Sequence, residues 1–407
     1  MHFNCKDLLP QSPQLSGECL LQNSKLIFPQ MKFADIIGNK SAIETLRNAV
    51  KNNRIPHALL ISGPAGIGKM RIARAFISYL NCENPTPDGD SCGKCPACRQ
   101  IDAFNHPDIH YVYPIYKIKS KDKTISSDYA DEWKRFVNES PYMDFAYWMG
   151  LMNAGNSQPQ ISVEEAAQIN VEAALSTFSA RYKVFIIWLP EKIGLQAANK
   201  LLKIIEEPHD DTLFICVSND PGSILPTIFS RLQRIETQRP SKDEISGALT
   251  ARGISPSTAD TFARLSEGSL LRAFQYAMSE GETGEFGEIF RSAMRYAFAK
   301  KVESLKALAD RLSDLGREKA LRLLDYFARM TRENFIANLC VPPLNIMTPD
   351  EEAFSSKFAP FINVANVEEI LKEIDEAKRD ISRNANSKIV WFDFFIKLLI
   401  LIRKKPN

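Results

Sequence analysis

Four short apolar runs, each ended by polar or turn residues, stand out in the first half of the chain. They are HALLIS (57–62), DIHYVYP (108–114), KVFIIWL (183–189) and TLFICVS (212–218). Runs of this kind suit strands that are buried on both faces, as in a parallel sheet. The segments between them carry helical patterns. Residues 41–51 open with the capping box Ser41-x-x-Glu44, and residues 196–207 place an apolar stripe on one face before Pro208. The alternation predicts an α/β domain with helices on both faces of a sheet.

The strand signals stop after residues 238–240, and the rest of the chain shows helical patterns only. A break is predicted near residues 279–285, and a loop with prolines near 341–350. The apolar segment 389–402 is too short to span a membrane and contains two charges, so it is predicted to be a core helix. The predicted organisation is a loose N-terminal extension (1–30), an α/β domain (31–239), a small helical domain (240–283) and a larger helical domain (284–407).

Composition narrows the class of protein further. The chain has 407 residues, 44% of them hydrophobic and 25% charged, which is typical of a globular protein and excludes a disordered or fibrous one. Its 51 basic and 49 acidic residues nearly cancel, so any contact with nucleic acid needs a local basic patch. Residues 1–30 lack the apolar run of a secretory signal, and we expect a cytoplasmic protein with no membrane partner.

The segment GPAGIGKM (63–70) matches the phosphate-loop pattern G-x-x-x-x-G-K-[ST] up to Lys69, but Met70 replaces the hydroxyl residue that holds Mg²⁺. It follows a predicted strand and opens a predicted helix, which is the context this motif requires. Backbone N–H groups of the turn and the Lys69 charge would face phosphates. The alternative is a glycine-rich turn that joins strand and helix without a ligand.

Hydrolysis of a nucleotide also needs carboxylates at the end of a neighbouring strand. The strand in the right place ends in Trp188 and Leu189, where an active enzyme would carry Asp-Glu. Glu191 follows two residues later and would need a register shift to replace them. Because Met70 and the Trp188-Leu189 pair remove the same metal, the sequence predicts an ATPase frame without ATPase activity.

Four cysteines lie together in CENPTPDGDSCGKCPAC, at Cys82, Cys92, Cys95 and Cys98. Two C-x-x-C steps that share Cys95, with a fourth cysteine upstream, suit a tetrahedral zinc site with Zn–S bonds of ~2.3 Å. Four thiolate ligands leave no position for water, so such a zinc ion would be structural. A disulfide pair and a redox C-x-x-C are the alternatives.

Arg231 lies in LPTIFSRLQR, after an apolar helical segment near the edge of the α/β domain. An arginine in such a place can reach the γ-phosphate of a neighbouring subunit as an arginine finger. Composition alone favours a solvated or salt-bridged surface arginine.

The order of five sequence features resembles that of the delta-prime family of bacterial DNA polymerase III clamp-loader subunits, in the AAA+ superfamily. These features are the phosphate loop, the cysteine cluster after its helix, and the segments LQAANKLLKIIEEP, LPTIFSR and SEGSLLRAF. The resemblance implies a AAA+ α/β domain with an inserted zinc module (82–98), an all-α lid and an all-α collar that holds subunits in a ring. It assigns FADIIGNK (33–40) to the adenine pocket. It also implies a degenerate nucleotide site at Gly63, Gly66, Gly68 and Lys69, with Asn219 and Arg272 as sensors, and Arg231 as a finger acting in trans.

The implied function is that of a non-hydrolysing subunit in a hetero-oligomeric ring, which helps motor and clamp-opening subunits load a sliding clamp onto primed DNA. ATP or ADP would be bound without hydrolysis. One alternative is an active ATPase that uses Glu191, and another is a zinc-dependent DNA-binding module. Residues 116–160 form a longer connection than the family pattern, rich in aromatic and charged residues. They could be a contact surface or a tolerated insertion.

Overall fold

The computed structural model describes residues 31–117, 124–152, 158–209, 211–278, 280–338, 347–382 and 385–405. The N-terminal extension and most of the proline-containing loop near 341–350 lie outside these residues. The chain divides into two compact units, one that ends at Phe274 and one that begins at Gln275. Among the described residues, no helix combines the length and the apolar character needed to span a membrane.

The first unit is built on a five-stranded parallel sheet with the strand order β2-β3-β4-β1-β5. The four strands predicted from apolar runs are confirmed, whereas the fifth, β5, was not predicted. Only Ile235 of β5 is buried, so this edge strand has no apolar run to mark it. The strands are β1 (Ala58–Ser62), β2 (Ile109–Val112), β3 (Lys183–Trp188), β4 (Thr212–Ser218) and β5 (Gln233–Glu236).

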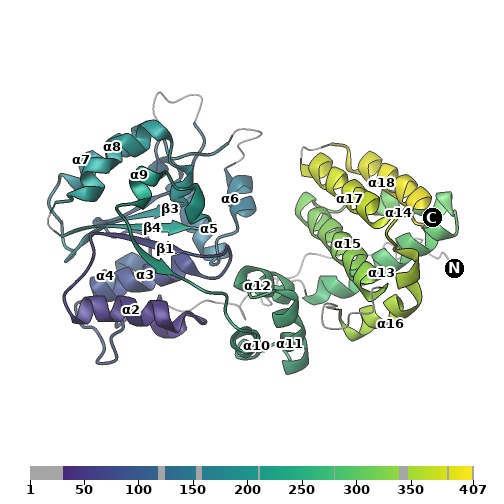
Figure 1. Ribbon diagram of the computed structural model, residues 1–407, viewed down its shortest axis with the longest axis horizontal. Coiled ribbons are helices and arrows are strands. Elements are labelled where there is room, and N and C mark those ends of the chain that lie inside the picture. Colours follow the sequence, from purple (N-terminus) through teal and green to yellow (C-terminus); the bar gives the residue numbers. More distant parts are fainter. Residues whose placement is uncertain are drawn as a thin grey trace, which may run out of the picture. The chain divides into compact units, whose positions relative to one another are not determined.

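Helices cover both faces of this sheet (Figure 1). Successive side chains of a strand point to opposite faces, so Leu59 and Ile61 of β1 join one apolar cluster while Ala58 and Leu60 join another. The predicted fold class, an α/β domain with a parallel sheet followed by helices, is confirmed. One face carries α2 (Lys40–Lys51), α3 (Lys69–Leu80) and α4 (Pro96–Asp102), and the other α7 (Val163–Ala173), α8 (Leu195–Glu206) and α9 (Pro226–Phe229).

The capping box predicted at Ser41 is wrong. Helix α2 begins at Lys40, one residue earlier, and its N-cap is Asn39 in the left-handed region, with no side-chain cap. The carboxamide of Asn39 instead accepts a hydrogen bond from the backbone N–H of Gln238, 2.9 Å away. This bond ties the start of α2 to the segment after β5.

A buried carboxylate fixes the loop before β3. Asp108 accepts hydrogen bonds of 2.7 to 2.8 Å from the backbone N–H groups of Phe178, Ser179 and Ala180. Burial alone would raise the pKa of Asp108, but the three backbone donors and the nearby His106 together lower it. The loop is therefore held by a carboxylate that stays ionised.

Three further helices follow the sheet along the chain, and α12 crosses the boundary of the first unit. They are α10 (Lys242–Thr250), α11 (Pro256–Leu265) and α12 (Leu270–Met278). Helix α10 begins with a capping box in which Ser241 and Glu244 bond each other's backbone N–H groups. Helices α10 and α11 pack against each other.

The described residues of the second unit form helices and their connections, without a strand. The helix α13 begins at Glu280 and runs through the stretch where a break was predicted. The apolar segment near the C-terminus is α18, a core helix as predicted, which buries Trp391, Phe394, Phe395 and Leu398 in the apolar cluster of this unit. The helices are α13 (Glu280–Phe298), α14 (Val302–Ser313), α15 (Arg317–Asn338), α16 (Pro349–Phe358), α17 (Val367–Ser382) and α18 (Ser387–Leu401).

Candidate functional site: a phosphate-type loop and a cysteine cluster

The phosphate-type loop connects β1 to α3, as the sequence predicted. Gly66 and Gly68 have φ angles of 76° and 94°, which glycine adopts without strain, and Gly68 is the N-cap of α3. Strand β4 lies beside β1 with Ser218 opposite Ser62, so Asn219 follows β4 at the same edge of the sheet as Gly63. Arg272 lies on α12, next to Leu271, whose N–H donates to the Gly66 carbonyl at 2.9 Å. The structure thus gathers the loop and both predicted sensors around one edge.

Lys69 does not point into open space above the loop. Its Nζ donates hydrogen bonds to the carbonyl oxygens of Gly63 at 2.7 Å and Pro64 at 2.5 Å. Burial lowers the pKa of Lys69 to about 7, and the negative charge of Glu191 only partly opposes this shift. The ammonium group is therefore directed at the backbone of its own loop, and at neutral pH it is only partly charged.

The positions that would hold Mg²⁺ lie in the hydrophobic core. Met70, Trp188 and Leu189 are all buried and belong to the same apolar cluster. The Trp188 ring lies 5.4 Å from the Trp133 ring and 5.3 Å from the Phe136 ring, centroid to centroid. Aromatic and aliphatic groups cannot coordinate a hard cation that requires oxygen ligands. The residues present do not fit a bound Mg²⁺.

Glu191, which follows β3 at this edge of the sheet, is engaged by β4 and the residues after it. Its Oε2 accepts a hydrogen bond from Ser218 Oγ at 2.8 Å, and its Oε1 accepts one from the backbone N–H of Asn219 at 3.1 Å. The backbone N–H of Asp220 donates to the same Oε1 at 3.3 Å. Glu191 therefore fixes the turn that carries Asn219. The sequence offered no signal for this role, because Glu191 lies 28 residues before its main backbone partner.

The two other predicted charged residues form ion pairs within the chain. Arg272 Nη1 bonds Glu267 at 3.1 Å, and both side chains are exposed. Arg231 Nε and Nη2 each lie 2.9 Å from Glu206 Oε2 at the end of α8, and Nη1 donates to the Thr227 carbonyl at 2.8 Å. Arg231 thus follows α9, on the face of the sheet opposite α3 (Figure 1). The structure brings it to α8 and does not bring it to the phosphate-type loop.

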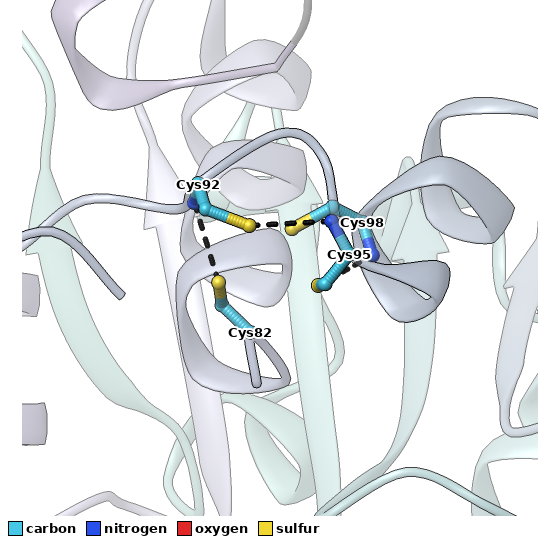
Figure 2. Close-up of side chains that lie close together, drawn as sticks. All are labelled: Cys82, Cys92, Cys95 and Cys98. Atoms are coloured by element: carbon cyan, nitrogen blue, oxygen red, sulfur yellow. Dashed lines mark hydrogen bonds between the residues drawn. The ribbon is translucent and has the colours of Figure 1, made fainter. Parts of the chain in front are cut away.

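The four predicted cysteines gather in the connection between α3 and α4 and in the first turn of α4. Cys82 comes just after α3, and Cys95 is the N-cap of α4 (Figure 2). The Sγ atoms of all four lie within 4.8 Å of one another, and each is a free thiol. Tetrahedral zinc with bonds of ~2.3 Å places its sulfur ligands roughly 3.8 Å apart. The cluster can therefore close around a metal ion with small side-chain movements.

Backbone N–H groups point at these sulfur atoms. Cys92 N–H lies 3.2 Å from Cys82 Sγ, and the N–H groups of Lys94 and Cys95 lie 3.3 Å from Cys92 Sγ. Such donors stabilise the negative charge of thiolates, the form that binds metal. The donor set fits a structural zinc ion, which Cys82, Cys92, Cys95 and Cys98 would hold without an open position.

The turn that carries the cysteines also holds the segment before α2, a link that sequence reasoning missed. The buried carboxylate of Asp90 accepts hydrogen bonds from the backbone N–H groups of Phe33 and Ala34, both at 3.0 Å. Arg47 Nε donates to the Gly89 carbonyl at 3.0 Å. The cysteine module therefore positions the segment 33–40, which the resemblance placed at the adenine pocket.

Comparison with known proteins identifies the family. The family model described as "DNA polymerase III, delta subunit" matches residues 38–241, half of the chain. The chain belongs to this family. The matched region covers the sheet, the phosphate-type loop and the cysteine cluster, and the predicted resemblance to a clamp-loader subunit of this family is confirmed.

Curated relatives agree with this assignment. DNA polymerase III subunit delta' of Pseudomonas aeruginosa is 31% identical over 175 residues, 43% of this chain and 41% of that protein. Subunit delta' of Bacillus subtilis is 24% identical over 261 residues, 63% of this chain and 66% of that protein. Subunit tau of Bacillus subtilis is 28% identical over 223 residues, 55% of this chain and 32% of that protein. The aligned part of this chain thus spans 32% to 66% of the length of these relatives.

Proposed function

We propose that this chain is a non-hydrolysing subunit of a DNA polymerase III clamp loader and supplies Arg231 to ATP bound by a neighbouring subunit. The observation that carries the proposal is the burial of Met70, Trp188 and Leu189 in one apolar cluster. Mg²⁺ is needed to bridge the β- and γ-phosphates and to neutralise the charge that develops during phosphoryl transfer. A chain without its metal ligands contributes to the ring through contacts rather than through turnover.

The alternative of an active ATPase has less support from the geometry. Glu191 would have to orient a metal ion or a water molecule, yet its carboxylate oxygens accept three hydrogen bonds from Ser218, Asn219 and Asp220. Releasing the carboxylate would deprive the Ser218 hydroxyl and the Asn219 N–H of this acceptor, at a cost of about 1 to 3 kcal/mol for each buried donor. The Asp220 N–H would keep Ser218 Oγ, 3.1 Å away. Similarity to a tau subunit keeps this alternative open to experiment.

The ion pair between Arg231 and Glu206 is compatible with a role in trans. Glu206 is more than half exposed and Arg231 is 30% exposed, so water screens the pair and its net contribution is small. A γ-phosphate offers the guanidinium two oxygens and more negative charge than one carboxylate. On assembly, Arg231 would exchange Glu206 for the phosphate of the neighbouring subunit.

The cysteine cluster in this proposal holds a structural zinc ion. In the same turn, Asp90 binds the backbone of the segment before α2, and the Gly89 carbonyl accepts a hydrogen bond from Arg47 of α2. The reading as a zinc-dependent DNA-binding module has no support from these contacts, since they face the chain's own backbone.

The test is reconstitution of the ring from this chain, the motor subunits and the clamp-opening subunit, with primed DNA and the sliding clamp. Removing an arginine finger costs about 10³ to 10⁵ in rate at the site it serves. One chain serves one of several sites, so Arg231→Ala should lower the stimulated ATPase of the ring by less than this, while assembly is unchanged. Arg231→Lys should restore little, because an ammonium lacks the planar fork.

Arg234→Ala is the matched control, because Arg234 is an exposed neighbour whose guanidinium lies 5.0 Å from the Phe229 ring. It should leave ATPase and clamp loading unchanged. Full activity of the Arg231→Ala ring, or ATP turnover by the isolated chain that Lys69→Ala abolishes, would refute the proposed function.

A further inference from the structure

The two ends of the insertion 116–160 lie side by side. Ile115 and Gln160, at its two ends, exchange backbone hydrogen bonds of 3.1 and 3.2 Å. Its described part contains the short 3-10 helix η3 (Ser126–Tyr129) and the helices α5 (Ala130–Glu139) and α6 (Phe145–Leu151). The structure can therefore address the two readings that the sequence left open for this insertion.

The insertion is anchored by aromatic side chains at the end of β3. Trp133 stacks on Tyr113 with ring centroids 4.0 Å apart, and it contacts Trp188 at 5.4 Å. Trp148 lies edge-on to Trp133 at 5.5 Å, and its Nε1–H donates to the Pro114 carbonyl at 2.9 Å. All of these rings are buried. The helices α5 and α6 thus cover the strand end where a nucleotide-binding domain would carry its carboxylates.

The turn between α5 and α6 places the Tyr142 side chain against the phosphate-type loop. Tyr142 is 3% exposed, and its ring carbons would lie 3.4 and 3.6 Å from a Cβ placed on Gly68. The ring stacks on Phe274 of α12, with centroids 5.1 Å apart and planes 13° apart. The Arg71 guanidinium of α3 lies 5.9 Å from its centroid. One side chain of the insertion therefore joins the loop, the helix after it and α12.

The helix α12 closes the same loop from a second side. Besides the hydrogen bond from Leu271 N–H to the Gly66 carbonyl, a Cβ placed on Gly66 would lie 2.7 Å from Ser269 Oγ and 2.8 Å from Leu271 Cβ. The Lys69 ammonium is bonded to the loop carbonyls. A phosphate held by Lys69 would require its ammonium to leave the Gly63 and Pro64 carbonyls, and α12 and Tyr142 already pack against Gly66 and Gly68. The residues present do not fit a bound nucleotide.

We propose that Tyr142 occupies the nucleotide site of this chain and locks α12 onto the phosphate-type loop, so that the domain stays closed without ATP or ADP. The inference rests on the proposed function, since a subunit that supplies Arg231 needs a fixed shape and gains nothing from a nucleotide cycle. The stacking of Tyr142 on Phe274 replaces the contacts by which a bound nucleotide would hold α12 against the loop. The insertion is then neither a separate contact surface nor a passive loop.

The test is titration of the full chain with a fluorescent ADP analogue and with unlabelled ADP in the presence of Mg²⁺. When the site is open in only a small fraction of the molecules, the apparent Kd equals the Kd of the open site divided by that fraction. Wild type should bind ADP with a Kd above about 1 mM, and Tyr142→Ala should bind ADP at least about tenfold more tightly. Tyr142→Phe keeps the ring and its stacking, so it should bind as weakly as wild type.

Tyr147→Ala is the matched control, because Tyr147 lies on α6 in the same insertion and bonds the exposed Glu139. It should leave ADP binding unchanged. A wild-type Kd below about 1 mM, or a Tyr142→Ala chain that gains less than tenfold, would overturn the proposal.

Hydrogen exchange at the Leu271 amide provides a second measurement that does not depend on ligand binding. This amide is bonded to the Gly66 carbonyl. It should exchange at least about tenfold faster in Phe274→Ala, in which the stacking partner is removed from the side of α12. Unchanged protection would also overturn the proposal. These experiments use the isolated chain, whereas the proposed function is tested by the Arg231 dependence of the ring, so either can fail without the other.

Discussion

Replacing Trp188 with aspartate puts back a carboxylate at a position where an active ATPase has one, and we expect it to damage the fold without creating activity. Trp188 is buried among aromatic rings, with Trp133, Phe136 and Phe145 at centroid distances of 5.3 to 6.0 Å. Truncating a buried tryptophan costs about 3 to 5 kcal/mol. Burying an unpaired carboxyl in its place adds a desolvation penalty of about 1 to 3 kcal/mol even when the group takes a proton.

The expected loss for Trp188→Asp is therefore about 4 to 8 kcal/mol, a large part of the 5 to 15 kcal/mol that stabilises a typical domain. Trp188→Phe keeps an aromatic ring and loses only the outer part of the indole, so we expect a loss of about 2 kcal/mol. In a unit of this size, 1 kcal/mol lowers Tm by about 2 to 4 °C. Trp188→Phe should then lose about 4 to 8 °C and Trp188→Asp at least about twice that.

Intrinsic fluorescence can follow the first unit in the full chain during heating, since Trp133 and Trp148 remain in both variants while Trp391 reports on the second unit. ATP turnover is measured on the same samples below the transition. A Trp188→Asp chain as stable as Trp188→Phe, or one that hydrolyses ATP, would refute the argument that an aromatic core has replaced the metal site.

The remaining predictions concern the metal, one carboxylate and one helix face. Metal analysis of protein purified without chelators should find about one zinc per chain; Cys95→Ser should lose it and speed hydrogen exchange at the Phe33 amide, and a zinc content near zero in wild type would end the claim. The folded-state pKa of Asp108 is lowered, so its stabilisation is present above the unfolded value of about 3.9 and disappears as pH falls through the folded value. Asp108→Asn should therefore lower Tm at pH 7 and make little difference near pH 2, and an equal loss at both pH values would contradict this. Ile389 and Ile400 are exposed on α18, so changing both to serine should weaken co-elution with partner subunits while Tm stays within a few degrees of wild type; unchanged co-elution would argue against this face as an assembly surface.

Local patterns in the sequence were sufficient for the parts of the fold that depend on local physics. The strands β1, β3 and β4 are buried on both faces, so nearly every residue in them is apolar and the run is visible. The phosphate-type loop (63–70) and the cysteine cluster (82–98) are short motifs, each contained in one continuous stretch of the sequence. The edge strand β5 has one buried residue, Ile235, and therefore gave no such pattern.

Contacts between distant parts of the chain could not be predicted in this way. Asp90 bonds a segment 56 to 57 residues earlier, and the Tyr142 ring stacks on Phe274, which comes 132 positions later. Glu206 and Arg231 are 25 residues apart. Each residue type is ordinary at its position, because a buried tyrosine or an exposed glutamate is common in any globular protein. Their roles depend on which partners the fold brings to them, and that information is spread over the whole chain.

The loss of the metal ligands and the closure of the loop by Tyr142 belong to one packing arrangement. Trp188, at the end of β3, supports the rings of Trp133 and Phe136 on α5, and α5 and α6 in turn hold the turn that carries Tyr142. Interiors are close-packed, so a carboxylate and its hydrated metal ion could not be placed at residue 188 without displacing these rings. The insertion and the apolar replacements at the former metal site are thus coupled physically. In the proposed function, this aromatic cluster would give the chain a rigid domain for presenting Arg231, and the same cluster would exclude the metal-dependent chemistry for which the phosphate-type loop is suited.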